Sequence, residues 1–108
     1  VALPDGTGDD AYLSLLERLL PEVFTFAPDM VLYQSGVDPL SGDKLGRLAL
    51  AHAGLQARDR MLIESCQASG VPLVITLGGG YAEPIERTAE AHANTFRVAA
   101  EVYGPAEL

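Results

Sequence analysis

Apolar residues recur along this chain in two rhythms, one typical of helices and one typical of strands. The segment AYLSLLERLL carries apolar side chains at i, i+3 and i+4 spacing, which predicts a helix capped by Thr7 or Asp9. Pro21 does not by itself end this helix, but Pro28 must, because proline in a helix interior removes a hydrogen bond and clashes with the preceding turn.

The rest of the chain alternates between strand and helix patterns. Met30 to Gln34 and Val71 to Leu77 are nearly continuous apolar runs, typical of parallel strands that are buried on both faces. Between them, Gly54 to Ser69 predicts a helix that ends at Gly70. After Pro84 a third helix is predicted, with one apolar stripe along it. The stripe consists of Ile85, Thr88, Ala89, His92, Phe96, Ala99 and Val102.

This order of elements predicts an α/β fold that contains one βαβ unit. Parallel strands joined by a helix belong to sheets that have helices on both faces. Two strands alone leave the outer edges of the sheet unpaired, so the pattern indicates part of a larger, multi-stranded parallel sheet. The opening VALPDGTGDD, which does not begin with Met, supports the same expectation.

The composition restricts the classes of function. The formal net charge is −8, and seven basic residues are scattered among fifteen acidic ones, whereas nucleic-acid binding needs clustered Lys and Arg. No apolar run approaches the roughly 20 residues needed to span a bilayer. The single Cys66 cannot form an internal disulfide and fits a reducing compartment. These features predict a cytoplasmic protein that binds neither nucleic acid nor membrane.

Two polar, glycine-rich loops follow directly on the predicted strands: SGVDPLSGD (35–43) and GGGY (78–81). Ligands in open α/β sheets bind beyond the carboxyl ends of the strands, and parallel strands end at the same edge. Asp38 and Tyr81 are therefore expected to face one pocket, Asp38 with a carboxylate and Tyr81 with a hydroxyl donor. Taken singly, Asp38 is also compatible with a local turn, the glycines with a tight turn or phosphate cradle, and Tyr81 with packing.

The order and spacing of these motifs resemble the C-terminal part of the zinc-dependent histone deacetylase family, above all its class IV and bacterial members. The family pattern G-x-D-x-x-x-x-D-x-[LM]-G is met from Gly36 to Gly46, and G-G-G-Y from Gly78 to Tyr81. The opening LPDGTGDDAYL also resembles the segment that leads into this part of the family. The resemblance implies the arginase/deacetylase fold, with residues 1–108 as the C-terminal portion of a single catalytic domain and the N-terminal portion absent from this chain.

The resemblance also implies roles for particular residues. Asp38 stands at the position of a carboxylate ligand of the catalytic Zn²⁺, and Tyr81 at that of the tyrosine that donates to the substrate carbonyl and the oxyanion. Leu45, Gly79 and Gly80 match positions that line the acyl-lysine channel. The implied reaction is hydrolysis of an acylated lysine, polyamine or related amide by a metal-activated water.

Other residues of interest are expected to be structural. Asp43, the second aspartate of the first loop, is expected to fix that loop as a hydrogen-bond acceptor. The family's Asp-x-His pair and tandem His-His are missing, so this chain alone is expected to be inactive. His92 is expected in the core, His52 at the surface or at a helix cap, and Cys66 as an inert buried thiol. ARDR (57–60) is expected to be a solvated helical face.

Two other functions stay open from the residues alone. A noncatalytic Rossmann-like module would use the glycine loop to cradle the phosphate of a nucleotide, although the G-x-G-x-x-G spacing is absent. A structural segment that pairs with another chain would have no chemistry of its own.

Overall fold

The computed structural model describes residues 1–104. They form, in order, α1 (Asp9–Thr25), β1 (Val31–Gln34), α2 (His52–Ser69), β2 (Leu73–Thr76) and α3 (Ile85–Tyr103). The two strands pair in parallel, with Val31 opposite Leu73 and Gln34 opposite Thr76. The predicted order is therefore confirmed, and α2 is the helical crossover of a βαβ unit.

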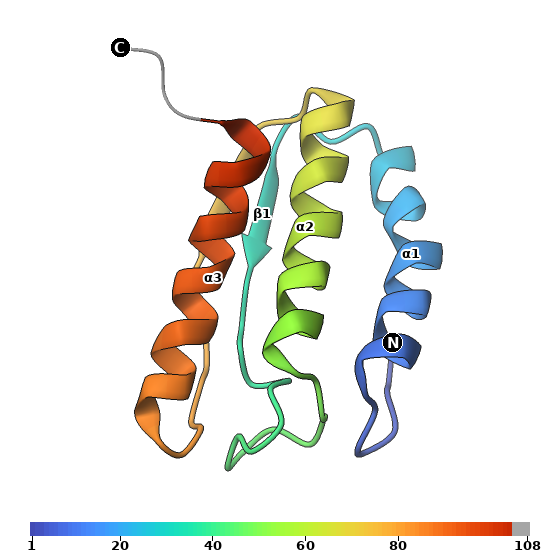
Figure 1. Ribbon diagram of the computed structural model, residues 1–108. Helices are drawn as coiled ribbons and strands as arrows, with labels where there is room; N and C mark the ends of the chain where they lie inside the picture. The colour runs from blue at the N-terminus through green and yellow to red at the C-terminus, as the bar shows by residue number, and fades with distance from the viewer. Residues whose placement is uncertain (105–108) are drawn as a thin grey trace.

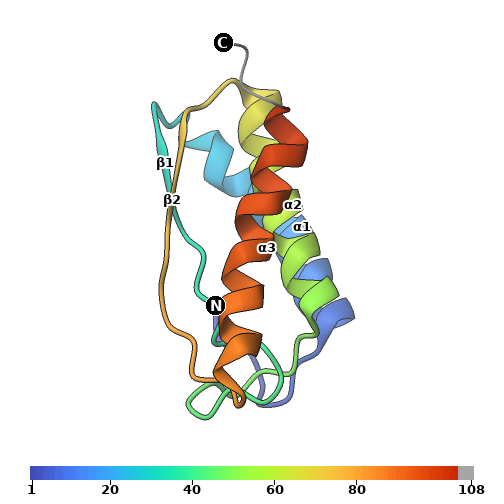
Figure 2. The ribbon, with the colours of Figure 1, turned by 60° about the vertical axis from the view of Figure 1, so that its left-hand side comes forward.

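The three helices form one layer, with α2 between α1 and α3 (Figure 1). Figure 2 shows that this layer covers one face of the two-stranded sheet. Burial alternates along both strands as a result: Tyr33 and Ile75 are partly buried, whereas Leu32 is 71% and Val74 41% exposed. Within residues 1–104 the helices cover only one face of the sheet. The prediction that the strands of the larger sheet are buried on both faces stays a prediction.

The main apolar core lies where the segments that follow the strands meet the helices. Its buried members are Val37, Leu40, Leu50, Leu55, Ala82 and Ala91. The first candidate loop therefore contributes Val37 and Leu40 to the core, and Ala82 anchors the chain directly after the second loop. Further along α2, Cys66 is completely buried, as predicted, and burial raises the pKa of its thiol.

The start of α1 differs from the prediction. The residue before the helix is Gly8, and no side chain caps it. Thr7 instead donates its hydroxyl to the carbonyl of Pro4 (2.7 Å), and the Asp9 carboxylate accepts from the backbone N–H of Ala51 (2.9 Å). The predicted side-chain cap is wrong because both polar groups have other partners, and Asp9 ties α1 to the start of α2.

The helix ends match the prediction better than the helix faces. α1 continues through Pro21 to Thr25, and α2 ends where Gly70 adopts a left-handed φ of 67°. On α3, however, Ile85 and Phe96 of the predicted apolar stripe are exposed. The buried residues of α3 are Thr88, Ala91, Asn94, Thr95 and Val98. The buried face therefore shares only Thr88 with the predicted stripe and consists mostly of small or polar side chains. Within residues 1–104, no helix has the length and apolar character to cross a membrane.

Candidate functional site

The loops that follow β1 and β2 lie beside each other at the end of the sheet where the helices begin (Figure 1). The N–H of Val37 donates to the carbonyl of Gly78 (3.3 Å), so the pairing of the two backbone segments continues beyond the ends of β1 and β2. Further along, the N–H of Lys44 donates to the carbonyl of Tyr81 (3.1 Å). The two loops that were expected to converge do so.

Asp38 reaches from the first loop to the glycine loop. A Cβ added at Gly36 would lie 2.9 Å from Oδ1 of Asp38, and one added at Gly79 would lie 3.2 Å from the same atom. The carboxylate therefore rests against two residues that lack side chains, and a larger residue at either position would crowd it. Asp38 is otherwise exposed, so its oxygens remain accessible.

Asp43 is a buried clamp that joins the two loops. Its Oδ1 accepts hydrogen bonds from the N–H groups of Leu45 (2.9 Å) and Gly46 (2.8 Å), and its Oδ2 accepts from the N–H of Tyr81 (2.7 Å). Burial by itself raises the pKa of this carboxyl, but the three N–H donors outweigh burial and hold the pKa below its usual value. The prediction that Asp43 fixes the loop is confirmed, and the clamp extends to the backbone of Tyr81.

Two of the motif glycines are required by close packing. A Cβ at Gly46 would overlap with the carbonyl oxygen of Asp38. Gly80 has a φ of 112°, and a Cβ there would overlap with the methyl group of Thr88 and lie 2.8 Å from a methyl group of Val37. The glycines in these two motifs therefore hold the loops close to each other and to α3.

The predicted catalytic and channel side chains lie at the surface of this chain. Tyr81 and Leu45 are both exposed. Tyr81 lines an open depression together with Lys44, Glu83 and neighbouring residues, and the Lys44 ammonium lies 2.5 Å from the Glu83 carboxylate across the two loops. The backbone of Tyr81 is fixed, whereas its phenol ring is exposed; its role in turnover stays a prediction.

The two histidines lie on different helices, His52 on α2 and His92 on α3. His92 is half-buried, not a core residue as predicted, and its Nε2 lies 3.3 Å from the carbonyl oxygen of Gly79. His52 is the first residue of α2, immediately after the N-cap residue Ala51. The contact of His92 ties α3 to the glycine loop.

The prediction that residues 57–60 form a solvated face is wrong for the two central residues of this segment. Arg58 is 5% and Asp59 1% exposed. α2 lies between α1 and α3 and over the sheet, so its side chains have little access to solvent on this face. The sequence did contain a signal, because Leu55 and Leu62 lie three or four positions from both charged residues, on the same helical face.

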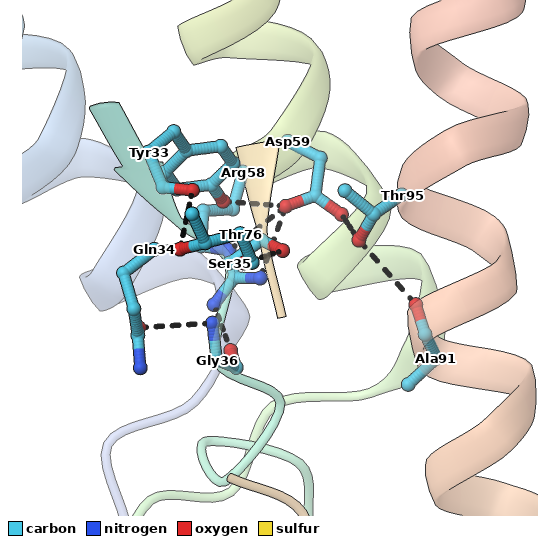
Figure 3. Close-up of polar contacts among 9 residues, drawn as sticks. All are labelled: Tyr33, Gln34, Ser35, Gly36, Arg58, Asp59, Thr76, Ala91 and Thr95. Carbon is cyan, nitrogen blue, oxygen red and sulfur yellow. Dashed lines mark hydrogen bonds and ion pairs between the residues drawn. The ribbon is translucent and has the colours of Figure 1, made fainter. Parts of the chain in front are cut away.

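Arg58 and Asp59 form a network with both neighbouring elements (Figure 3). Nε and Nη2 of Arg58 donate to Oδ1 of Asp59 (3.1 and 3.0 Å), and Nη1 donates to the carbonyl of Gly36 (2.6 Å). The Tyr33 hydroxyl of β1 donates to Oδ1 of Asp59 (2.5 Å), and the Thr95 hydroxyl of α3 donates to Oδ2 (2.7 Å). The network therefore joins α2 to β1, to α3 and to the start of the Asp38 loop.

The charges in this network follow from burial and from the neighbouring groups. Burial raises the pKa of Tyr33, and the nearby Arg58 offsets this effect only in part. Burial by itself lowers the pKa of Arg58, but Tyr33 and Asp59 outweigh it, so the pKa is raised. Tyr33 is thus a neutral hydrogen-bond donor and Arg58 a cation at neutral pH.

The donor set fits part of a zinc site. Within residues 1–104, no group of three or more His, Cys, Asp or Glu side chains gathers in a way that could hold a metal ion. Asp38 alone has the features of a single ligand, because it presents an accessible carboxylate supported by the glycines around it. The role of Asp38 as a metal ligand stays a prediction for the residues that the structure describes.

Solved structures define the class of fold. The chain matches acetylpolyamine aminohydrolase from Burkholderia pseudomallei with a TM-score of 0.75 and 24% identity, over 94% of this chain and 28% of that one. It matches the HDA15 HD domain with a TM-score of 0.63 and 28% identity, over 92% of this chain and 31% of that one. The predicted arginase/deacetylase-type α/β fold is confirmed, and the chain corresponds to part of it.

The profile of the histone deacetylase domain family matches residues 1–98, so the chain belongs to this family. It is 39% identical over 104 residues to an uncharacterized protein of Picosynechococcus, covering 95% of this chain and 35% of that protein. It is 37% identical over 83 residues to histone deacetylase 2 of Arabidopsis thaliana, covering 75% of this chain and 21% of that protein. The chain thus spans about a third or less of the length of these relatives.

Proposed function

We propose that residues 1–108 form the C-terminal portion of a zinc-dependent deacetylase domain, and that the complete domain hydrolyses an acylated lysine, polyamine or related amide. Membership of the histone deacetylase family supports this proposal. The observation that carries it is the position of Asp38, whose carboxylate rests against Gly79 in the loop that carries Tyr81.

In this proposal Asp38 is one ligand of the zinc ion, and the remaining ligands come from the N-terminal portion of the domain. A bound zinc ion supplies the Lewis acidity that polarises an amide carbonyl and makes a water molecule nucleophilic at neutral pH. Gly36 and Gly79 leave the Asp38 carboxylate accessible, and Gly46 allows the backbone of Asp38 to pack closely against the rest of its loop.

Tyr81 donates its hydroxyl hydrogen to the carbonyl oxygen of the substrate and to the oxyanion that develops from it. A donor held in place for an oxyanion contributes about 2.7–4 kcal/mol to transition-state stabilisation. The clamp from Asp43 to the N–H of Tyr81 fixes the backbone from which the phenol projects. Gly79 and Gly80 leave room for the acyl-lysine chain, and Leu45 offers it an apolar contact.

The exposed apolar residues on the open face of the sheet fit the same proposal. Leu32 and Val74 lie on the face that the helices leave uncovered. The N-terminal portion of the domain would continue the sheet and cover this face, as parallel sheets are covered on both sides.

The alternative of a nucleotide-binding module has less support. Phosphate-binding glycine loops lead directly into a helix, whose N-terminus attracts the anion. Here residues 81–84 separate the glycines from α3, which begins at Ile85.

The test compares two site variants of the full-length protein with wild type. Asp38→Ala is expected to lose bound zinc, measured by elemental analysis after purification. Tyr81→Phe is expected to keep its zinc and lose turnover of acetyl-lysine peptide or acetylpolyamine by about 10²–10³-fold. Asp10→Ala, an exposed aspartate in α1, is the matched control and should change neither. Full zinc content and full rate in Asp38→Ala would refute the proposal.

A further inference from the structure

Arg58 is the most deeply buried cation in the part of the chain that the structure describes, and the proposed reaction makes no use of it. Its partner Asp59 is even less exposed. Removing two charges from water costs several kcal/mol for each ion, and a buried ion pair is often no more stabilising than well-packed apolar residues. Stability alone is therefore a weak reason for a buried Arg–Asp pair at this position.

The guanidinium of Arg58 is held by Asp59 on one side and contacts the carbonyl of Gly36 on the other (Figure 3). Two of its nitrogens donate to Asp59, and its Cζ lies over the Tyr33 ring, 5.7 Å from the ring centre. These contacts fix the orientation of the guanidinium. The remaining nitrogen, Nη1, donates to the carbonyl oxygen of Gly36 at 2.6 Å, a short charge-assisted hydrogen bond.

Gly36 is the residue through which β1 passes into the loop that carries Asp38. Its N–H donates to the side-chain oxygen of Gln34 (3.1 Å), and its carbonyl accepts from Arg58. Both of its backbone polar groups are therefore paired. The space where its Cβ would lie is only 2.9 Å from Oδ1 of Asp38, so the position of Gly36 limits where that carboxylate can lie.

We propose that Arg58 is a positioning residue for the metal ligand Asp38: from α2 it fixes the carbonyl of Gly36, and through it the conformation that presents the Asp38 carboxylate to the zinc ion. This inference rests on the proposed function, because it requires Asp38 to be a ligand. Asp59 holds Arg58 through its Oδ1, and Tyr33 donates to the same oxygen. Loss of such an outer partner typically weakens metal binding by about 10–100-fold.

The experiment measures the Zn²⁺ affinity of the full-length protein by competition with a chelator, and the thermal unfolding midpoint of the zinc-free protein. The double variant Arg58→Met/Asp59→Asn removes both charges, so no buried charge is left unpaired. The asparagine retains an oxygen that accepts from Tyr33 or Thr95, whereas the donor to Gly36 is lost. We expect Zn²⁺ binding about 10–100-fold weaker, with an unfolding midpoint no lower than that of Thr95→Val, because removal of the buried ion pair offsets the lost hydrogen bonds.

Thr95→Val is the matched control for a purely structural role. It removes a buried hydrogen bond to Asp59 on the side away from Gly36 and leaves the contact from Arg58 to Gly36 in place. We expect a lower unfolding midpoint and unchanged Zn²⁺ affinity. If the double variant does not fold, Arg58→Lys is measured instead: a single ammonium cannot reproduce the fork that bonds both Asp59 and Gly36, so weaker Zn²⁺ binding is again expected.

The outcomes separate this inference from the proposed function. Wild-type Zn²⁺ affinity in the folded double variant, or in Arg58→Lys where that variant is used, overturns the role of Arg58 and leaves the deacetylase proposal standing. Zn²⁺ affinity that falls in Thr95→Val in step with stability also overturns it, because the loss would then follow general destabilisation. Wild-type zinc content together with the wild-type rate in Asp38→Ala overturns the proposed function itself.

Discussion

Replacing Asp43 by asparagine tests whether one buried carboxylate holds the two site loops together. The carboxylate accepts three backbone hydrogen bonds, from Leu45, Gly46 and Tyr81. Asparagine has nearly the same shape but only one acceptor oxygen. If that oxygen keeps the bonds to Leu45 and Gly46, the amide NH₂ faces the N–H of Tyr81, and two donors oppose each other.

The expected loss follows from these three contacts. A hydrogen bond to a charged group contributes about 1.5–3 kcal/mol and a neutral one about 0.5–1.5 kcal/mol. Two bonds of Asp43 become neutral and weaken, and the third, to Tyr81, is lost. Allowing for relaxation of the exposed loop around Tyr81, we expect Asp43→Asn to lower the free energy of unfolding by about 3 kcal/mol.

The assay is urea unfolding of the zinc-free, full-length protein at neutral pH, with the midpoint compared at an unchanged dependence on urea. Asp38→Asn is the matched control, since Asp38 lies in the same loop but its carboxylate is exposed. The control should stay within about 0.5 kcal/mol of wild type. A loss below about 0.5 kcal/mol in Asp43→Asn, or an equal loss in Asp38→Asn, would refute the clamp.

Three further predictions concern pH, the glycines and the thiol. Folding lowers the pKa of Asp43, so the extra stability of wild type over Asp43→Asn should depend on pH. This difference in the free energy of unfolding should be complete well above pH 3.8 and should vanish as the pH falls through the lower, folded-state pKa. Urea midpoints measured across this pH range check it. Gly70 has a left-handed φ and open space around it, so Gly70→Ala should lower the free energy of unfolding, measured by thermal unfolding, by about 1–2 kcal/mol. Gly80→Ala should lower it clearly more, because the added Cβ would overlap with Thr88. Equal losses in the two variants would contradict the packing at Gly80. Cys66 should react with iodoacetamide only when the protein is unfolded, as measured by mass; rapid labelling of the native protein would show that it is not buried.

The order of elements and the place of the two loops were determined by the sequence itself. Helix and strand periods are local properties, so the apolar pattern located α1, β1, α2 and β2 to within a few residues. Gly70 marked the end of α2 because only glycine adopts its left-handed φ at little cost. Parallel strands end at one edge of a sheet, so the same pattern predicted that the loops carrying Asp38 and Tyr81 would meet.

Which faces of these elements are buried was decided by the tertiary structure. The apolar stripe on α3 was misplaced because the buried face uses Ala91, Asn94 and Thr95, whose small or polar side chains give a weak apolar signal. The strands were expected to be buried on both faces, yet all three helices pack on one side in residues 1–104. The spacing of apolar residues indicates which face of a helix or strand is apolar, and it does not say which neighbouring element covers that face.

The Arg58–Asp59 network shows this limit most clearly. Two adjacent charges in a helix are usually solvated, and here burial became acceptable only because Tyr33, Gly36 and Thr95 supply partners from β1, the following loop and α3. Those partners lie 22 to 36 residues away from Arg58 or Asp59 along the chain. The sequence by itself identified Asp38 and Tyr81 as the candidate residues. The packing of α2 determined which group pairs with the carbonyl of Gly36 beside Asp38, because hydrogen bonds between distant segments exist only after the chain has folded.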